Sequence, residues 1–117
     1  MMDEIRVGRH VDQLRKRREQ IVMTLQHIGR EQEQVEHNTD WLDQAAYESR
    51  VNLLDRLNDW YIEEMHQIDK ALLRIGKNQY GLCLGCHHSI GVERLESVPV
   101  AEFCSACQEA RDGLEER

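Results

Sequence analysis

The stretch YGLCLGCHHSIGVERLESVPVAEFCSACQEAR, residues 80–111, contains every cysteine of the chain in two Cys-x-x-Cys pairs with seventeen residues between them. A Cys-x-x-Cys turn brings two sulfur atoms to the spacing that one metal ion needs, and two such turns complete a tetrahedral shell of thiolates. We therefore predict one structural zinc ion. Its ligands are predicted to be Cys83, Cys86, Cys104 and Cys107.

Other uses of these sulfur atoms are alternatives. Two disulfides, or a redox dithiol formed by either pair, are disfavoured by the matched second pair in a chain that we expect to be cytosolic. The segment CLGCH, residues 83–87, also fits the haem attachment pattern, but haem would leave the second pair without a role. His87 and His88 are alternative ligands, yet four thiolates already close the shell, so we expect both on the surface.

The residues around the cysteines suit tight turns. Gly81, Gly85 and Gly91 permit the backbone conformations that such turns require. The segment SVPVAEF, residues 97–103, is suited to hold the two cysteine turns in register. Because a closed shell of thiolates leaves no position for water or substrate, the predicted metal is structural.

The residues before this module favour two long helices, since no proline and only two glycines occur between residues 3 and 76. Apolar side chains follow heptad spacing in both halves, which is typical of a coiled coil. The first seam is Val7, Val11, Leu14, Arg18, Ile21, Leu25, Ile28, Gln32 and Val35. The second seam is Leu54, Leu57, Tyr61, Met65, Ile68, Leu72 and Ile75, with a doubled step of four that should locally unwind the supercoil.

The segment EHNTDWLDQAAYE, residues 36–48, separates the two seams and contains the turn and N-cap residues Asn38, Thr39 and Asp40. Helices joined by so short a turn run antiparallel. The sequence thus predicts a chain dominated by α-helices, with a long antiparallel coiled-coil hairpin over residues 1–76 and its tip at residues 38–46. A small four-cysteine zinc finger with a short C-terminal helix is expected over residues 77–117.

Composition and charge exclude several classes of function. The 117 residues are 40% apolar and 32% charged, which is lean for a globular core. The first residues form neither a secretory signal nor a membrane span, so we expect a cytoplasmic protein without membrane contact. Residues 38–117 hold 15 acids against 8 bases, and RKRR at residues 15–18 points around most of a helix. Direct sequence-specific DNA binding is therefore not expected.

Asp40 and Asp43 lie three residues apart at the expected start of the second helix. The ordinary structural explanation is that Asp40 caps the free amides at the start of the helix and that Asp43 complements the helix dipole. The same spacing presents two carboxylates at the tip of the hairpin, where they can meet a metal ion, a basic side chain or a loop of a partner.

Residues 9–111 resemble the DksA/TraR family of bacterial RNA polymerase regulators. The tip sequence DWLDQA, residues 40–45, has Asp40, Asp43 and Ala45 at the three defining positions of the family's Asp-x-x-Asp-x-Ala motif. Residues 80–108 resemble the family's finger, with Tyr-Gly before the first cysteine, Arg-Leu-Glu at residues 94–96 and Pro99. Because the sequence starts almost directly with the first arm, we expect this protein to differ from longer members of the family, in which a globular extension precedes the hairpin.

The resemblance implies a regulator that catalyses no reaction. It implies insertion of the hairpin into the secondary channel of RNA polymerase, with Asp40, Asp43 and Ala45 altering the stability of promoter complexes near the active centre. In the family, basic residues of the second arm and the finger mediate the response to the alarmone ppGpp of the stringent response. The corresponding positions are Gln67, Arg94, Val98 and Gln108, of which only Arg94 is basic, so a weak or absent ppGpp effect is predicted.

Two other functions are compatible with the sequence. A Gre-like transcript-cleavage factor uses carboxylates at its tip to hold a second magnesium ion, although such factors lack a four-cysteine finger. A zinc-stabilised coiled-coil adaptor without a polymerase role would use the two aspartates only as caps. We expect a monomer, although a polar seam residue such as Arg18 is also compatible with a surface for another chain.

Overall fold

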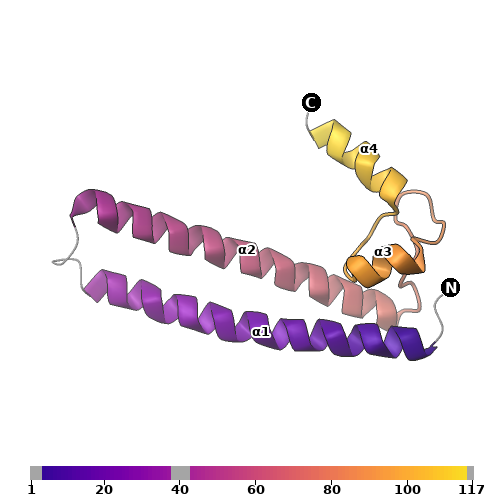
Figure 1. Ribbon diagram of the computed structural model, residues 1–117, viewed down its shortest axis with the longest axis horizontal. Coiled ribbons are helices and arrows are strands. Elements are labelled where there is room, and N and C mark those ends of the chain that lie inside the picture. The colour runs from indigo at the N-terminus through magenta and orange to yellow at the C-terminus, as the bar shows by residue number, and fades with distance from the viewer. Residues whose placement is uncertain (1–3, 38–42, 116–117) are drawn as a thin grey trace. The chain divides into compact units, whose positions relative to one another are not determined.

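The computed structural model describes residues 4–37 and 43–115 of the chain, which form four helices (Figure 1). The helices are α1 (Glu4–His37), α2 (Gln44–Gly76), α3 (Val92–Ser97) and α4 (Ser105–Glu115). Strands are absent from these residues, and the pairing of Leu82 with Ser89 is an isolated antiparallel bridge. The predicted fold class, a long helical hairpin followed by a four-cysteine module and a C-terminal helix, is confirmed.

The chain folds as two compact units. One unit comprises residues 16–66, and the other brings residues 1–15 together with residues 67–117. The second unit therefore contains the beginning of α1, the end of α2 and the cysteine module. The boundary between residues 76 and 77 that the sequence suggests stays a prediction.

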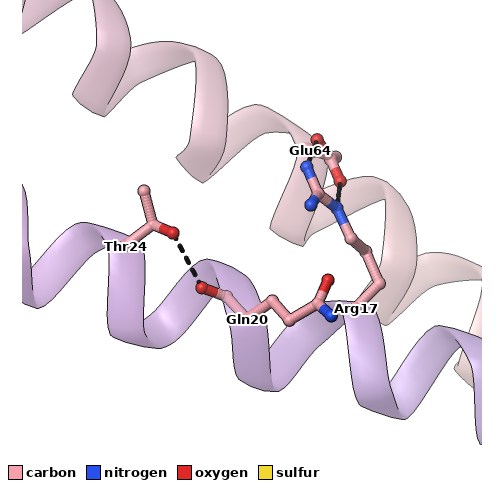
Figure 2. Close-up of polar contacts among 4 residues, drawn as sticks. All are labelled: Arg17, Gln20, Thr24 and Glu64. Carbon is pink, nitrogen blue, oxygen red and sulfur yellow. Dashed lines mark hydrogen bonds and ion pairs between the residues drawn. The ribbon is translucent and has the colours of Figure 1, made fainter.

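In the unit of residues 16–66, α1 and α2 run antiparallel: an earlier residue of α1 contacts a later residue of α2, and a later residue of α1 contacts an earlier residue of α2. The guanidinium of Arg17 donates two hydrogen bonds to the Glu64 carboxylate, from Nε to Oε2 at 2.5 Å and from Nη2 to Oε1 at 2.9 Å (Figure 2). Further along α1, Glu31 forms an ion pair with Arg50. Figure 2 also shows a hydrogen bond within α1, in which the Thr24 hydroxyl donates to the Gln20 carbonyl at 2.9 Å.

The core of this unit follows the predicted seams. Ile21, Ile28 and Leu54 are buried. Two seam positions differ from the expectation, since Arg18 is exposed and Leu57 is 37% exposed. Removing the Arg18 guanidinium from water would cost free energy, so this residue lies at the edge of the thin two-helix core and not inside it.

The unit that contains the cysteine module has a larger set of buried residues. Its buried apolar side chains are Leu14, Ile68, Ala71, Cys83, Ile90, Leu95 and Ala101. Two polar residues are buried among them, His10 and Arg74. Neither α1, α2 nor the shorter helices of the described residues combine the length and apolar character that a membrane crossing requires.

Candidate functional site: the cysteine cluster and the hairpin tip

The four cysteine sulfur atoms meet in one cluster. All of them lie within 4.8 Å of one another, and the sulfurs of Cys86 and Cys104 are 3.9 Å apart. Four thiolates at about 2.3 Å from a zinc ion have sulfur–sulfur edges of about 3.8 Å, so the cluster has the dimensions of a zinc site. No disulfide joins these cysteines. Both His87 and His88 are exposed and lie outside the cluster, as expected.

The first cysteine pair lies in a turn held by backbone hydrogen bonds. The amide of Cys83 donates to the His88 carbonyl, and the amide of Ile90 donates to the Gly81 carbonyl, both at 2.8 Å. Gly81 has a φ of 85°, a conformation that favours glycine. His87 adopts a φ of 63°, which nothing in the sequence predicted. The turn exposes backbone amides to sulfur, and the Gly85 amide lies 3.3 Å from Cys83 Sγ.

The second pair lies at the start of α4, and the backbone brings it onto the first. The Leu84 amide donates to the Glu102 carbonyl at 2.8 Å, and the Cys104 amide lies 3.3 Å from Cys83 Sγ. Gly85 is needed here for space, because a Cβ at this position would lie 3.0 Å from Cys107 Sγ. The hydrogen bond from Leu84 to Glu102 agrees with the expected role of residues 97–103 in holding the two turns together.

The thiol groups of the cluster differ in acidity. Burial raises the pKa of Cys83, but hydrogen bonds to its sulfur from the backbone at Cys104, Cys86 and Gly85 outweigh burial and lower the pKa to about 6. The pKa of Cys107 is raised, first by the hydrogen bonds that its thiol shares with neighbouring cysteines. One thiolate therefore forms readily, whereas further thiolates in so small a space need a cation. The cluster fits one structural zinc ion, which supplies that charge when bound.

Further contacts support the second pair from the side. Arg94 Nε donates to the Phe103 carbonyl at 2.9 Å, and the Arg111 guanidinium lies 4.4 Å from the centre of the Phe103 ring. Both contacts immobilise the residue that precedes Cys104. A cation over an aromatic face is a favourable contact, and it ties α4 to this segment.

Sequence reasoning missed two buried residues of the hairpin that contact this module, His10 and Arg74. A signal for each was present. His10 follows Val7 by three residues and precedes Leu14 by four, which places it on the buried face of α1. Arg74 follows the buried Ala71 by three residues on α2.

At the tip of the hairpin, the structure describes two of the three predicted residues. Asp43 and Ala45 are exposed, whereas Asp40 lies outside the described residues. Asp43 is the N-cap of α2, since its Oδ1 accepts a hydrogen bond of 2.7 Å from the Ala46 amide. The sequence assigned the capping role to Asp40 and a dipole role to Asp43, and the hydrogen bond from Ala46 gives Asp43 a capping role as well, because α2 begins at Gln44. The regulatory role of all three residues stays a prediction.

Comparison with known proteins gives a family for the cysteine module. Residues 78–113 match the sequence model of the prokaryotic dksA/traR C4-type zinc finger. The DksA/TraR resemblance is thereby confirmed, and relatives extend it beyond the finger. The RNA polymerase-binding transcription factor DksA of Escherichia coli is 30% identical over 91 residues, which are 78% of this chain and 58% of that protein.

Two further relatives cover a similar or larger part of the chain. An uncharacterized protein of Aquifex aeolicus is 34% identical over 86 residues, 74% of this chain and 57% of that protein. The structure of transcription factor DksA2 from Pseudomonas aeruginosa superposes with a TM-score of 0.87 at 26% identity, covering 98% of this chain and 89% of that one. The chain spans 57–58% of the length of the two curated relatives, from Aquifex aeolicus and Escherichia coli.

Proposed function

We propose that this chain, whose residues 78–113 form a DksA/TraR C4-type zinc finger, is a DksA-like transcription regulator that binds bacterial RNA polymerase. The hairpin enters the secondary channel, and the tip changes the stability of promoter complexes through Asp40, Asp43 and Ala45. The zinc ion is structural, and the protein catalyses no reaction. It acts in the cytoplasm as a monomer, without sequence-specific contacts to DNA.

The observation that carries this proposal is an exposed carboxylate at the start of α2, in a chain that also contains a zinc finger of this family. Asp43 is exposed at the beginning of a helix of 33 residues, and the cap bond to Ala46 fixes the direction of its carboxylate. A carboxylate held in one orientation loses little entropy when it meets a basic side chain or an amide of a partner. The small side chain of Ala45 leaves room for a loop to approach.

Weak or absent control by ppGpp is part of the proposal. A hollow of about 650 Å³ beside α3 is lined by residues that include Arg94 and Val98, two of the family's positions for nucleotide binding, together with Glu93. The Arg94 Nε is already bonded to the Phe103 carbonyl, and Gln108 is bonded to Asp112. A hollow whose one arginine, Arg94, already donates to the Phe103 carbonyl and lies beside Glu93 is a poor site for the negatively charged nucleotide.

The experiment that tests the proposal compares Asp43→Asn with the unchanged protein in the lifetime of promoter complexes formed by bacterial RNA polymerase. Asparagine is also a good N-cap residue, so α2 keeps its beginning while the charge is lost. We expect the variant to bind polymerase and to lose its effect on lifetime. Asp59→Asn, at an exposed position within α2, is the matched control and should behave as the unchanged protein.

The same reactions separate the alternatives. Normal activity of Asp43→Asn contradicts a regulatory tip and favours an adaptor whose aspartates only cap the helix. Shortening of the transcript in a stalled elongation complex favours a Gre-like cleavage factor. Strong potentiation of the effect by ppGpp contradicts the proposed independence from the nucleotide.

A further inference from the structure

Arg74 connects the last turn of α2 to the segment between the two cysteine pairs. Its side chain is buried, with the residue 8% exposed, and one terminal nitrogen donates to the Ala101 carbonyl at 3.1 Å. The other terminal nitrogen lies 3.6 Å from Glu102 Oε1. A buried guanidinium is costly unless its charge and its donors are met, so these contacts hold Ala101 and Glu102 against α2.

His10 makes a second connection from α1. It is 5% exposed, and its Nδ1 lies 2.9 Å from the hydroxyl of Tyr80. That hydroxyl donates to the Pro99 carbonyl at 2.8 Å. Because a carbonyl only accepts, the single hydroxyl hydrogen of Tyr80 goes to Pro99, and His10 must carry its hydrogen on Nδ1. The resulting chain of two hydrogen bonds ties α1 to Pro99.

The segment held by these two connections leads directly to the metal cluster. The Glu102 carbonyl accepts a hydrogen bond from the Leu84 amide, next to the first cysteine of the first pair. Two residues later, the Cys104 amide points at Cys83 Sγ. A shift of residues 99–102 would therefore be transmitted to both cysteine pairs.

We infer that Arg74 and His10, both outside the zinc-finger match at residues 78–113, are positioning residues of the metal centre. They hold residues 99–102 at the place from which the second cysteine pair meets the first. Neither residue is a zinc ligand, and both act through the backbone of this segment. This inference concerns metal binding and does not depend on the proposed role at RNA polymerase.

The test measures metal affinity in the full chain carrying Arg74→Gln. Cobalt(II) is titrated into the metal-free protein and followed by its thiolate and ligand-field absorption, and zinc affinity is then obtained by competition with a chromophoric chelator. Partners beyond the ligand shell of a metal commonly change its affinity by about 10- to 100-fold, and we expect a loss near the lower end of that range. The cobalt ligand-field bands should also shift, because the tetrahedron is distorted.

Arg17→Gln is the matched control. Arg17 is likewise an arginine paired with a glutamate, but it lies in the unit of residues 16–66. Its loss weakens the hairpin without touching residues 99–102, so metal affinity and cobalt bands should stay unchanged. Equal metal affinity of the Arg74→Gln and Arg17→Gln variants, with identical cobalt bands, overturns the inference.

Two more variants make the result independent of whether Arg74→Gln folds. Arg74→Lys keeps the charge but loses the fork that reaches Ala101 and Glu102 together, so it should bind metal with intermediate affinity. Tyr80→Phe removes the hydroxyl between His10 and Pro99 and should weaken binding several-fold. Wild-type affinity and wild-type cobalt bands in both of these variants contradict the positioning role.

Discussion

Replacing Gly85 with alanine should damage the zinc site through one steric contact. The added Cβ would lie 3.0 Å from Cys107 Sγ and 3.3 Å from Cys107 Cβ. Ordinary contacts between such atoms begin at about 3.5 Å, so the Cys107 side chain must move away by a few tenths of an ångström. Because Cys107 is one corner of the tetrahedron around the metal, we expect this movement to weaken metal binding.

The size of the effect follows from the cost of overpacking, which is typically about 1–3 kcal/mol. If the metal-bound state carries that cost, zinc affinity falls by about 5- to 150-fold, since about 1.4 kcal/mol corresponds to a factor of ten. Chelator competition on the purified full chain measures the change. Gly29→Ala is the control, because a Cβ there has no neighbour within 4 Å and alanine favours the helix by up to about 1 kcal/mol. Unchanged zinc affinity of the Gly85→Ala chain would refute the packing of Gly85 on Cys107.

Three further outcomes are expected. Glu64 accepts a hydrogen bond from Arg17, which lowers the pKa of its carboxyl, so the pair stabilises the hairpin above the usual pKa of 4.5 and this contribution is lost as the pH falls below it. A double-mutant cycle with Arg17→Gln and Glu64→Gln should give about 0.2–1 kcal/mol of coupling at neutral pH and none in acid. Burial raises the pKa of Tyr80 to about 12 from 10.0, so its contribution to stability is complete below pH 10 and is lost as the pH rises toward 12, which absorbance of the phenolate and alkaline unfolding should both report. Removal of zinc by a chelator should abolish amide-exchange protection in residues 83–107, because only a few buried side chains form the core there. Residues 16–66 should keep their protection, and loss of protection in both regions would contradict the division into two units.

The fold was predictable because its main features depend on the spacing of apolar residues and cysteines that are close together in the sequence. Heptad positions such as Ile21, Ile28 and Leu54 are buried as the periodicity requires, and the cysteine spacing alone indicated a cluster of four sulfurs. Such patterns depend on residues three, four or seven apart, whose relation within a helix is fixed by helix geometry.

The contacts that complete the site depend on distant residues, and no local pattern encodes them. His10 and Tyr80 are separated by 70 positions, and Arg74 and Ala101 by 27. The need for glycine at position 85 also arises only after the second cysteine turn has closed on the first. The cap of α2 raises a related difficulty, since two aspartates three residues apart are equally suitable caps in the sequence; Asp40 lies outside the described residues, and Asp43 accepts the capping bond from Ala46.

The most direct test of the proposed action on RNA polymerase is a photo-crosslinking measurement from the hairpin tip. A photoreactive residue replaces Gln44, which is exposed at the start of α2, and a second protein carries it in place of Leu114, which is 72% exposed in α4. With bacterial RNA polymerase, position 44 is predicted to crosslink to segments of the catalytic subunits around the active centre, and position 114 is not. Crosslinks from position 44 that map only to the outer surface of the polymerase, or that do not form at all, would contradict the account.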